Sequence, residues 1–435
     1  MLNSVKRILK RLLSSSIAKD ASIMSVGAAG SQLILFATIP ILARLYDPVD
    51  FGSMAVFIAV SQILSIPATG RYERGLLTTT TTGETASLIC GMAGLMVIWL
   101  LVIEVCIAAG SWGSLEFENA LFMLPIAAIA VAVTTVGEFC CTRDGYFKRV
   151  AITKTLLAAS IVGVQIAMAG RMGPGMGLIL GYVAGQVLIA LVHIVLILSS
   201  QRSEIVAALR DPSGILAVLR AYSGLPRYSL PAGLLNTVGR QSLILVSAGF
   251  FSTATVGYIE MANRVVRAPM NFVNQALEKV FVSRLGRNRR EGRSNIPLLR
   301  KAVRTLTAIA LLAGLVAYFL LEPIIVYVLG PQWSPAVIFG LLLLPAVFSN
   351  FITFPVSKMY IYGKEKIGLF WQTGYSAGTI LMLVLGGLAG TPVLAVALFA
   401  IFSAVMNILH LALTTKYAGG SLVGLFGLGR INLRN

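Results

Sequence analysis

The stretch "LILFATIPILARLYDPVDFGSMAVFIAVSQILSIPATG", residues 33–70, consists of two long apolar runs separated by a short polar turn. Neither run shows the alternation of apolar and polar residues that is typical of a half-buried strand. The first run continues back to residue 21, so each run is long enough for a helix that crosses a hydrocarbon core of about 30 Å, where an open sheet would leave backbone groups unpaired. The stretch therefore predicts a transmembrane helical hairpin with a short outward turn.

The same pattern continues along the whole chain of 435 residues, of which 57% are hydrophobic and 12% are charged. Soluble globular proteins are usually about 25% charged, and the mean hydropathy here is +0.85. We therefore predict an all-α polytopic membrane protein with twelve transmembrane helices. The expected spans are residues 21–45, 51–70, 84–109, 119–141, 150–170, 175–199, 227–250, 254–278, 304–328, 335–361, 367–388 and 392–415.

Lysine and arginine are distributed unevenly between the loops of this arrangement. Of the 35 basic residues, 30 lie in alternate loops, at the two chain ends or at the adjoining helix ends. The opposite loops contain only Arg44 and Arg171. Because basic residues favour the cytoplasmic side of short membrane loops, we expect both termini in the cytoplasm and residues 111–119 and 330–335 outside. The net charge of +18 thus indicates membrane orientation, and no nucleic-acid partner is expected.

The longest basic loop follows the sixth span and divides the chain into two halves of six helices. Phe51-Gly52 and Val256-Gly257, 205 positions apart, each begin a helix after a short outward turn. Duplicated halves around a midplane site are a common transporter design, and chance resemblance of two apolar hairpins is the alternative. The expected parts are a basic cytoplasmic N-terminal segment (1–20), an N-lobe of helices 1–6 (21–199), a cytoplasmic linker (200–226), a C-lobe of helices 7–12 (227–415) and a cytoplasmic tail (416–435).

The segment "VGYIEMANRVVRAPMNFVNQALEK", residues 256–279, departs from the apolar character of the other spans. Arginine at a bilayer centre costs at least ~2.5 kcal/mol, so it normally faces a cavity, a partner or a substrate. Polar residues recur at steps of three and four, which places them on one helix face: Glu260, Arg264, Arg267, Asn271, Asn274 and Glu278. We predict that this face lines a watered lumen. The lumen-lining polar residues are expected to be Asn236, Glu260, Asn263, Asn271 and Asn274.

Arg240, in the seventh span, also lies far from both ends of its helix. Glu260 and Arg264 are four residues apart and can neutralise each other, which leaves Arg240 and Arg267 as two positive charges. Guanidinium groups bind phosphate oxygens through paired hydrogen bonds. We therefore predict that Arg240, Arg264 and Arg267 bind an anionic part of a substrate, such as its phosphate oxygens. The alternative is that Arg267 extends towards the cytoplasm and Arg264 is only paired.

The motif "RYER", residues 71–74, falls at the cytoplasmic end of the second span. Arg71, Glu73 and Arg74 are a candidate cytoplasmic gate, with headgroup contact or a solvated loop as the alternatives. Small residues at steps of four in the sixth span predict close packing against a neighbouring helix: Gly177, Gly181 and Gly185.

No catalytic residues, metal or cofactor are expected. The four cysteines lie in apolar runs and match no CxxC metal spacing. The chain contains no P-loop and no evident Ser/His/Asp or paired-carboxylate set. The sequence therefore indicates a protein that is not an enzyme.

Two quoted stretches carry a resemblance to a known family. Three motifs resemble those of the polysaccharide transport family. They are "L-x-R-L-Y-x-P-x-D-F-G" near the start, the "RYE" that follows it, and "V-G-Y-x-x-x-A-x-R-x-x-x-x-P" in the second half. These are oligosaccharide flippases of the multidrug/oligosaccharidyl-lipid/polysaccharide exporter superfamily. The resemblance covers the two hairpins, and it covers the rest of the chain only by hydropathy.

The resemblance implies two six-helix lobes around a central cavity in the bacterial cytoplasmic (inner) membrane. It also implies translocation of an undecaprenyl-diphosphate-linked oligosaccharide from the inner to the outer leaflet, for O-antigen, capsule or exopolysaccharide synthesis. Partners would be this lipid-linked substrate, the bilayer and other glycan-assembly proteins. A multidrug or small-molecule exporter of the same fold is the alternative, although no acidic residue occurs from Ala21 to Tyr46, where some drug exporters carry one.

Overall fold

The computed structural model describes residues 16–110, 120–173 and 175–426, and it describes side chains from residue 30 onwards except 272, 275, 276 and 279. Within these ranges the regular structure is helical, without strands. The longer helices are α2 (Ser16–Leu45), α3 (Pro48–Ala68), α4 (Thr82–Ala108), α5 (Met123–Arg143), α6 (Phe147–Met168), α7 (Met176–Leu209), α9 (Leu230–Phe250), α10 (Thr253–Arg290), α11 (Ile296–Pro323), α12 (Ala336–Thr353), α13 (Glu365–Leu388) and α14 (Pro392–Tyr417). The shorter ones are η1 (Tyr72–Leu77), α8 (Pro212–Ala221), η3 (Leu225–Ser229), η4 (Ile324–Leu329), η5 (Pro331–Trp333), η6 (Met359–Tyr362) and α15 (Leu422–Phe426).

The fold class predicted from the sequence is confirmed. Each of the twelve predicted spans coincides with one of the longer helices. Nine helical segments of the described chain are long and apolar enough to cross a membrane, so the protein is a multi-pass membrane protein. The helices α9 and α10, which carry the predicted site, are not among the nine. The count of twelve spans and the central cavity stay predictions.

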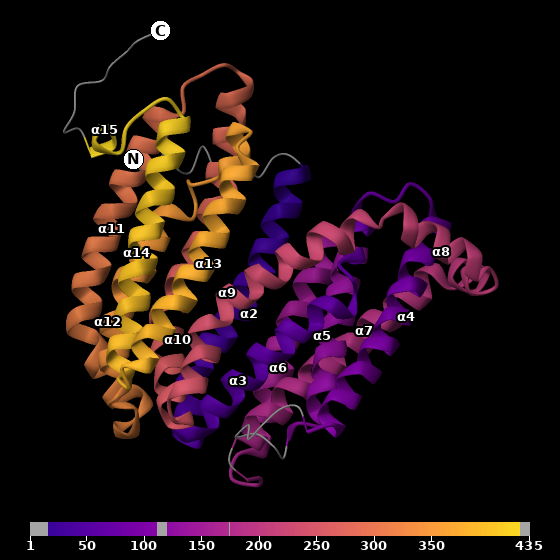
Figure 1. Ribbon diagram of the computed structural model, residues 1–435, viewed down its shortest axis with the longest axis horizontal. Helices are drawn as coiled ribbons and strands as arrows, with labels where there is room; N and C mark the ends of the chain where they lie inside the picture. The colour runs from indigo at the N-terminus through magenta and orange to yellow at the C-terminus, as the bar shows by residue number, and fades with distance from the viewer. Residues whose placement is uncertain (1–15, 111–119, 174, 427–435) are drawn as a thin grey trace. The chain divides into compact units, whose positions relative to one another are not determined.

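The chain divides into two compact units. The first comprises residues up to Tyr46 together with Ser53–Thr237, and the second comprises Asp47–Gly52 together with residues from Val238 onwards. The boundaries fall near the start of α3 and inside α9, so the first turn of α3 belongs to the second unit. Figure 1 shows the helices of both units in their chain order.

In the first unit, α6 packs against α2 and α7, and α7 also packs against α4 and α5. The predicted close packing of the glycine stripe is confirmed. A Cβ on Gly185 would lie 3.1 Å from the backbone nitrogen of Ile161, and one on Gly181 would lie 2.9 Å from that residue's carbonyl oxygen. The α6 and α7 backbones therefore approach each other more closely than larger side chains would allow.

The predicted linker 200–226 contains the end of α7 and the amphipathic helix α8. Asp211 caps α8, and hydrogen bonds from the Ser213 hydroxyl and the Gly214 N–H lower the pKa of its carboxyl group. The Tyr72 hydroxyl of η1 donates to the carbonyl oxygen of Leu219 at 3.1 Å, and α8 also packs against α4. This segment is therefore attached to the first unit.

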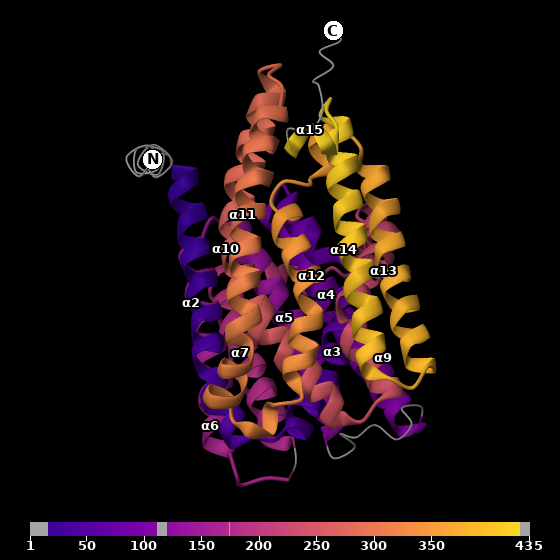
Figure 2. The same cartoon turned by 90° about the vertical axis from the view of Figure 1, so that its left-hand side faces the viewer.

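In the second unit, α12 packs against α10, α11 and α14, and α14 also packs against α13. Figure 2 shows α11, α12, α13 and α14 running alongside one another. Three predicted boundaries in this unit are wrong. The span predicted to begin at residue 304 begins at Ile296, the first residue of α11. The span 335–361 is too long, because α12 ends at Thr353. The span 254–278 is too short, because α10 continues to Arg290.

The two glycines of the internal repeat lie at one reciprocal contact within the second unit. A Cβ on Gly52 would lie 2.9 Å from the carbonyl carbon of Thr253, and one on Gly257 would lie 2.7 Å from that of Pro48. Pro48 and Thr253 are the first residues of α3 and α10 and are separated by the same 205 positions as the glycines. Each helix start therefore packs its backbone against the equivalent turn of the other.

Candidate functional site

The predicted polar face lies on one uninterrupted helix, α10, of the second unit. Pro269 lies inside this helix without ending it. Because the helix is continuous, the steps of three and four hold in the structure and the polar residues share a face. At ~1.5 Å per residue, Arg267 lies about 21 Å along the helix axis from Thr253.

Arg264 and Glu260 form the ion pair that their spacing predicts. The Nε of Arg264 donates to Oε1 of Glu260 at 2.6 Å. Their side chains are 29% and 14% exposed. The Arg264 guanidinium carbon also lies 5.7 Å from the centroid of the Phe51 ring, within the range of a cation–π interaction. The positive charge of Arg264 is therefore neutralised by Glu260, and the Phe51 ring holds its guanidinium group in position.

Phe51 is part of a buried aromatic group at the start of α3. Its ring packs edge-on against Trp333 with centroids 5.1 Å apart, and Trp333 packs edge-on against Tyr258 at 6.2 Å. Phe51 and Trp333 are fully buried. The Phe51 ring beneath Arg264 is thus held in place by Trp333 of η5, which in turn packs against Tyr258 of α10. The spacing of the charges along the chain gave no sign of this aromatic contact.

Arg267 differs from Arg264 in its surroundings. Its Nε atom is buried and has no hydrogen-bond partner among the described residues. Six ion pairs occur in the described part of the chain, and none includes Arg267. An uncompensated charge in a low-dielectric environment is costly. The side-chain oxygens of Asn263 and Asn274 are likewise buried without a described partner.

The remaining predicted site residues have different environments. The side chains of Arg240 and Asn236 on α9 are exposed, and so is the side chain of Asn271 on α10. Asn274 is only 3% exposed. The neighbour of Arg240, Gly239, packs against α13, where a Cβ would lie 2.8 Å from the Cβ of Ser376. A role for these residues in binding stays a prediction.

Glu278, at the end of the predicted stripe, forms an ion pair that sequence reasoning missed. Its Oε1 accepts a hydrogen bond from the Lys358 ammonium at 2.5 Å. The Lys358 ammonium also lies 4.1 Å from the centroid of the Phe354 ring. The 80 residues between the partners explain why no local pattern revealed the pair.

The predicted gate residues lie in a strained turn of the first unit. Gly70 and Arg71 have φ values of 58° and 63°, a left-handed conformation that is uncommon outside glycine. Glu73 is 1% exposed, 3.3 Å from Nη1 of Arg71, and accepts a hydrogen bond from the Thr69 hydroxyl at 2.6 Å. Arg74 is exposed. A gating role stays a prediction, and strain at one non-glycine residue is a feature often found at functional turns.

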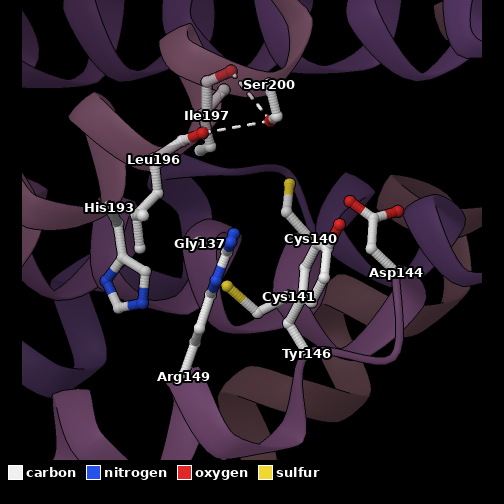
Figure 3. Close-up of a pocket in the computed structure, with 10 residues that line it drawn as sticks. All are labelled: Gly137, Cys140, Cys141, Asp144, Tyr146, Arg149, His193, Leu196, Ile197 and Ser200. Atoms are coloured by element: carbon white, nitrogen blue, oxygen red, sulfur yellow. Dashed lines mark hydrogen bonds between the residues drawn. The ribbon is translucent and has the colours of Figure 1, made fainter.

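A small cavity lies between α5 and α7 in the first unit (Figure 3). His193 is fully buried there beside Gly137, and neither of its ring nitrogens has a described partner. The cavity volume is about 10 Å³, which is about the space for one water molecule. It is too small for a substrate, and no cluster of metal-ligating side chains occurs in the described residues.

The fold and site together define an all-helical, multi-pass membrane protein with an arginine-bearing helix in its second unit. Residues 41–338 match the model of a family described as polysaccharide biosynthesis protein, and the chain belongs to this family. The family predicted from the sequence is thus confirmed.

Similar proteins include transporters. The chain is 23% identical over 405 residues to the succinoglycan biosynthesis transport protein ExoT of Rhizobium meliloti (strain 1021), covering 90% of this chain and 78% of that protein. The fold is similar to that of the lipid II flippase MurJ in an inward closed conformation, with a TM-score of 0.68, 14% identity and coverage of 95% and 93%. It also resembles an inward-facing multidrug resistance MATE transporter of the MOP superfamily, with a TM-score of 0.53, 14% identity and coverage of 94% and 96%.

Proposed function

We propose that this protein is a flippase that moves an undecaprenyl-diphosphate-linked oligosaccharide from the inner to the outer leaflet by alternating access. The product would be used for a cell-surface polysaccharide such as O-antigen, capsule or exopolysaccharide. Support comes from the polysaccharide biosynthesis family, from a relative named as a succinoglycan transport protein and from the fold shared with a lipid II flippase.

The observation that carries the proposal is the contrast between two arginines on α10. Arg264 has its charge balanced by Glu260 at 2.6 Å. Arg267, three residues further along, has a buried Nε without a described partner. A buried guanidinium is stabilised when an anion with good hydrogen-bonding geometry reaches it. A diphosphate supplies several such oxygens, so Arg267 is the proposed primary ligand.

The other predicted residues would support this ligand. Arg264, held between Glu260 and the Phe51 ring, would offer its remaining N–H groups to the same anion. Arg240 of α9 would add positive charge during translocation. The amide group of Asn271, which is exposed on the same helix, would accept hydrogen bonds from sugar hydroxyls. The lipid tail would stay in the bilayer.

Replacement of Arg267 tests this role. Cells that lack the gene should accumulate a lipid-linked oligosaccharide on the inner side, detectable by mass spectrometry of extracted lipids. Arg267→Gln should fail to relieve this accumulation at equal membrane abundance, and Arg267→Lys should relieve it in part, because charge remains but the paired geometry is lost. Arg287→Gln, an exposed change on the same helix, is the matched control. Wild-type export by Arg267→Gln would remove Arg267 from the site.

A multidrug or small-molecule exporter is the second candidate, and the similarity to MATE transporters favours it. The uncompensated Arg267 opposes binding of cationic drugs, because like charges repel in a low-dielectric site. Drug-resistance measurements distinguish the two functions. A change in resistance on gene deletion, with no accumulated lipid-linked oligosaccharide, would support the exporter.

We expect the protein to reside in the bacterial cytoplasmic (inner) membrane with both termini in the cytoplasm, and other glycan-assembly proteins are candidate partners. The orientation rests on the 30 basic residues on one side against two on the other. Single cysteines, placed after the four native ones are replaced, should react with an impermeant reagent in intact cells at residue 332. They should stay unreactive at residue 294, and the reverse pattern would overturn the orientation.

A further inference from the structure

A pocket lies at the basic end of α10, away from the site described above. Its volume is about 430 Å³, within the roughly 300–1,000 Å³ that is typical of small-molecule sites. All of its walls belong to the second unit. They are Val282, Ser283, Gly286, Arg289 and Arg290 of α10 and Tyr360 and Ile361 in η6.

The pocket is held by a rigid framework. Leu285 is fully buried in a cluster with Leu299 and Val303 of α11, and its carbonyl oxygen accepts a hydrogen bond from the Asn295 side chain at 3.3 Å. The end of α10 is closed by paired backbone bonds, from Arg293 N–H to the carbonyl oxygen of Asn288 at 2.8 Å and from Gly292 N–H to that of Arg289 at 3.3 Å. This is the glycine-terminated end that stabilises a helix C-terminus.

Positive charge in the pocket is not balanced by its own walls. None of the residues that line it is acidic. The nearest acid along α10 towards the membrane, Glu278, is paired with Lys358 at 2.5 Å, and Glu291 is paired with Arg293 at 3.1 Å. The Arg289 guanidinium lies 5.9 Å from the centroid of the buried Tyr362 ring. Arg289 and Arg290 therefore present two guanidinium groups to one cavity.

The pocket also has a polarity that runs along α10. Val282 lies beyond residue 278, the end of the span predicted from the sequence, and Arg290 lies about 12 Å further along the helix axis. Ile361 and the exposed Tyr360 ring form the facing wall. The pocket thus combines apolar and aromatic walls with two arginines, an arrangement that suits an amphiphile with an anionic headgroup.

We propose that this pocket binds the phosphate group of a membrane lipid, with Arg289 and Arg290 as its ligands. The inference goes beyond the translocation function and does not depend on it. Two lipid sources share this chemistry, an anionic phospholipid and the diphosphate of a polyprenyl lipid. The walls favour the phospholipid, because a single phosphate matches two guanidinium groups and its apolar acyl chains match Val282 and Ile361.

Gly286 offers a variant that blocks the pocket without changing its charge. A Cβ there would meet only Nη1 of Arg290, at 3.9 Å, which is ordinary contact. Gly286 lies inside α10 with a negative φ, so leucine is compatible with the backbone and fills the cavity. Arg289→Gln combined with Arg290→Gln removes the proposed ligands. Arg284→Gln combined with Arg287→Gln removes the same charge from neighbouring positions that do not line the pocket.

The experiment measures binding of fluorescent phosphatidylglycerol to the purified full-length protein in neutral detergent. We expect Gly286→Leu and the Arg289/Arg290 double variant each to weaken binding about tenfold or more, and the Arg284/Arg287 variant to weaken it less than about threefold. Thermal unfolding of each variant establishes that it is folded. Equal losses of lipid affinity in the two double variants, or undiminished lipid binding by Gly286→Leu, would refute the proposal that this pocket binds the lipid.

Competition then identifies the source of the phosphate. A short-chain polyprenyl diphosphate that displaces the phospholipid at lower concentration would assign the same site to the polyprenyl lipid, and weaker displacement would assign it to the phospholipid. Displacement by free pyrophosphate as strong as that by the polyprenyl diphosphate would show that the lipid portion is irrelevant and would refute a lipid site. Absence of binding by both lipids would refute it as well.

Discussion

Alanine at Gly257 should separate two helix starts that are in backbone contact. The new Cβ would overlap the carbonyl oxygen of Pro48, and it would lie 2.7 Å from the carbonyl carbon of Pro48 and 3.2 Å from the backbone nitrogen of Gly52. Because carbon atoms pack at about 3.5–4.0 Å, the start of α10 has to move by at least about 0.8 Å relative to the start of α3. Backbone atoms cannot rotate away as a side chain can.

The expected cost follows from two opposing effects. Overpacking a tight contact costs about 1–3 kcal/mol, and the movement also disturbs Phe51, which is fully buried and 5.1 Å from the Trp333 centroid. Replacing glycine by alanine inside a helix returns about 0.5–1 kcal/mol. We therefore expect Gly257→Ala to lower the free energy of unfolding by about 1–2 kcal/mol, seen as a fall in melting temperature of about 1–2 °C for a chain of this length.

The assay is thermal unfolding of purified protein in detergent, with Gly249→Ala as the matched control. Gly249 lies in α9, and a Cβ there meets nothing within 4 Å, so this variant should be neutral or slightly stabilised. Gly52→Ala should resemble Gly257→Ala. In the double variant one separation relieves both clashes, so the combined cost should be less than the sum. A Gly257→Ala protein as stable as Gly249→Ala, or a fully additive double variant, would refute the reciprocal contact.

Two further variants test side chains in each unit. Glu260→Gln should leave Arg264 unpaired and lower the free energy of unfolding by ~1–3 kcal/mol, less than the ~3–5 kcal/mol of a fully buried pair, because Arg264 is 29% exposed. Adding Arg264→Gln should recover stability by thermal unfolding but reduce glycan export, and full export by the stable double variant would exclude Arg264 from substrate binding. Gly137→Ala places a Cβ against the His193 ring and should cost about 1–3 kcal/mol. His193→Ala should restore much of this loss in the same unfolding assay, and a failure to do so would show that the ring is not the obstacle.

The sequence by itself determined the class of the protein and the places of its helices. Long apolar runs can satisfy their backbone groups in a bilayer only as helices, so hydropathy was sufficient for the spans. It was insufficient for their ends outside the bilayer. The α10 extension to Arg290 and the amphipathic helix α8 lie in basic segments, where charge indicates the side of the membrane and not whether the backbone is helical.

The ion pair of Glu260 and Arg264 was predictable because residues four apart on a helix are neighbours. Only the tertiary structure decided which charges stay unbalanced. Glu278 pairs with Lys358, 80 positions away in the sequence, and Arg264 contacts the Phe51 ring, more than 200 positions away. The Nε atom of Arg267 has no partner among the described residues. Local periodicity fixes the face of a helix on which a side chain lies, but the packing of distant segments fixes what that face meets.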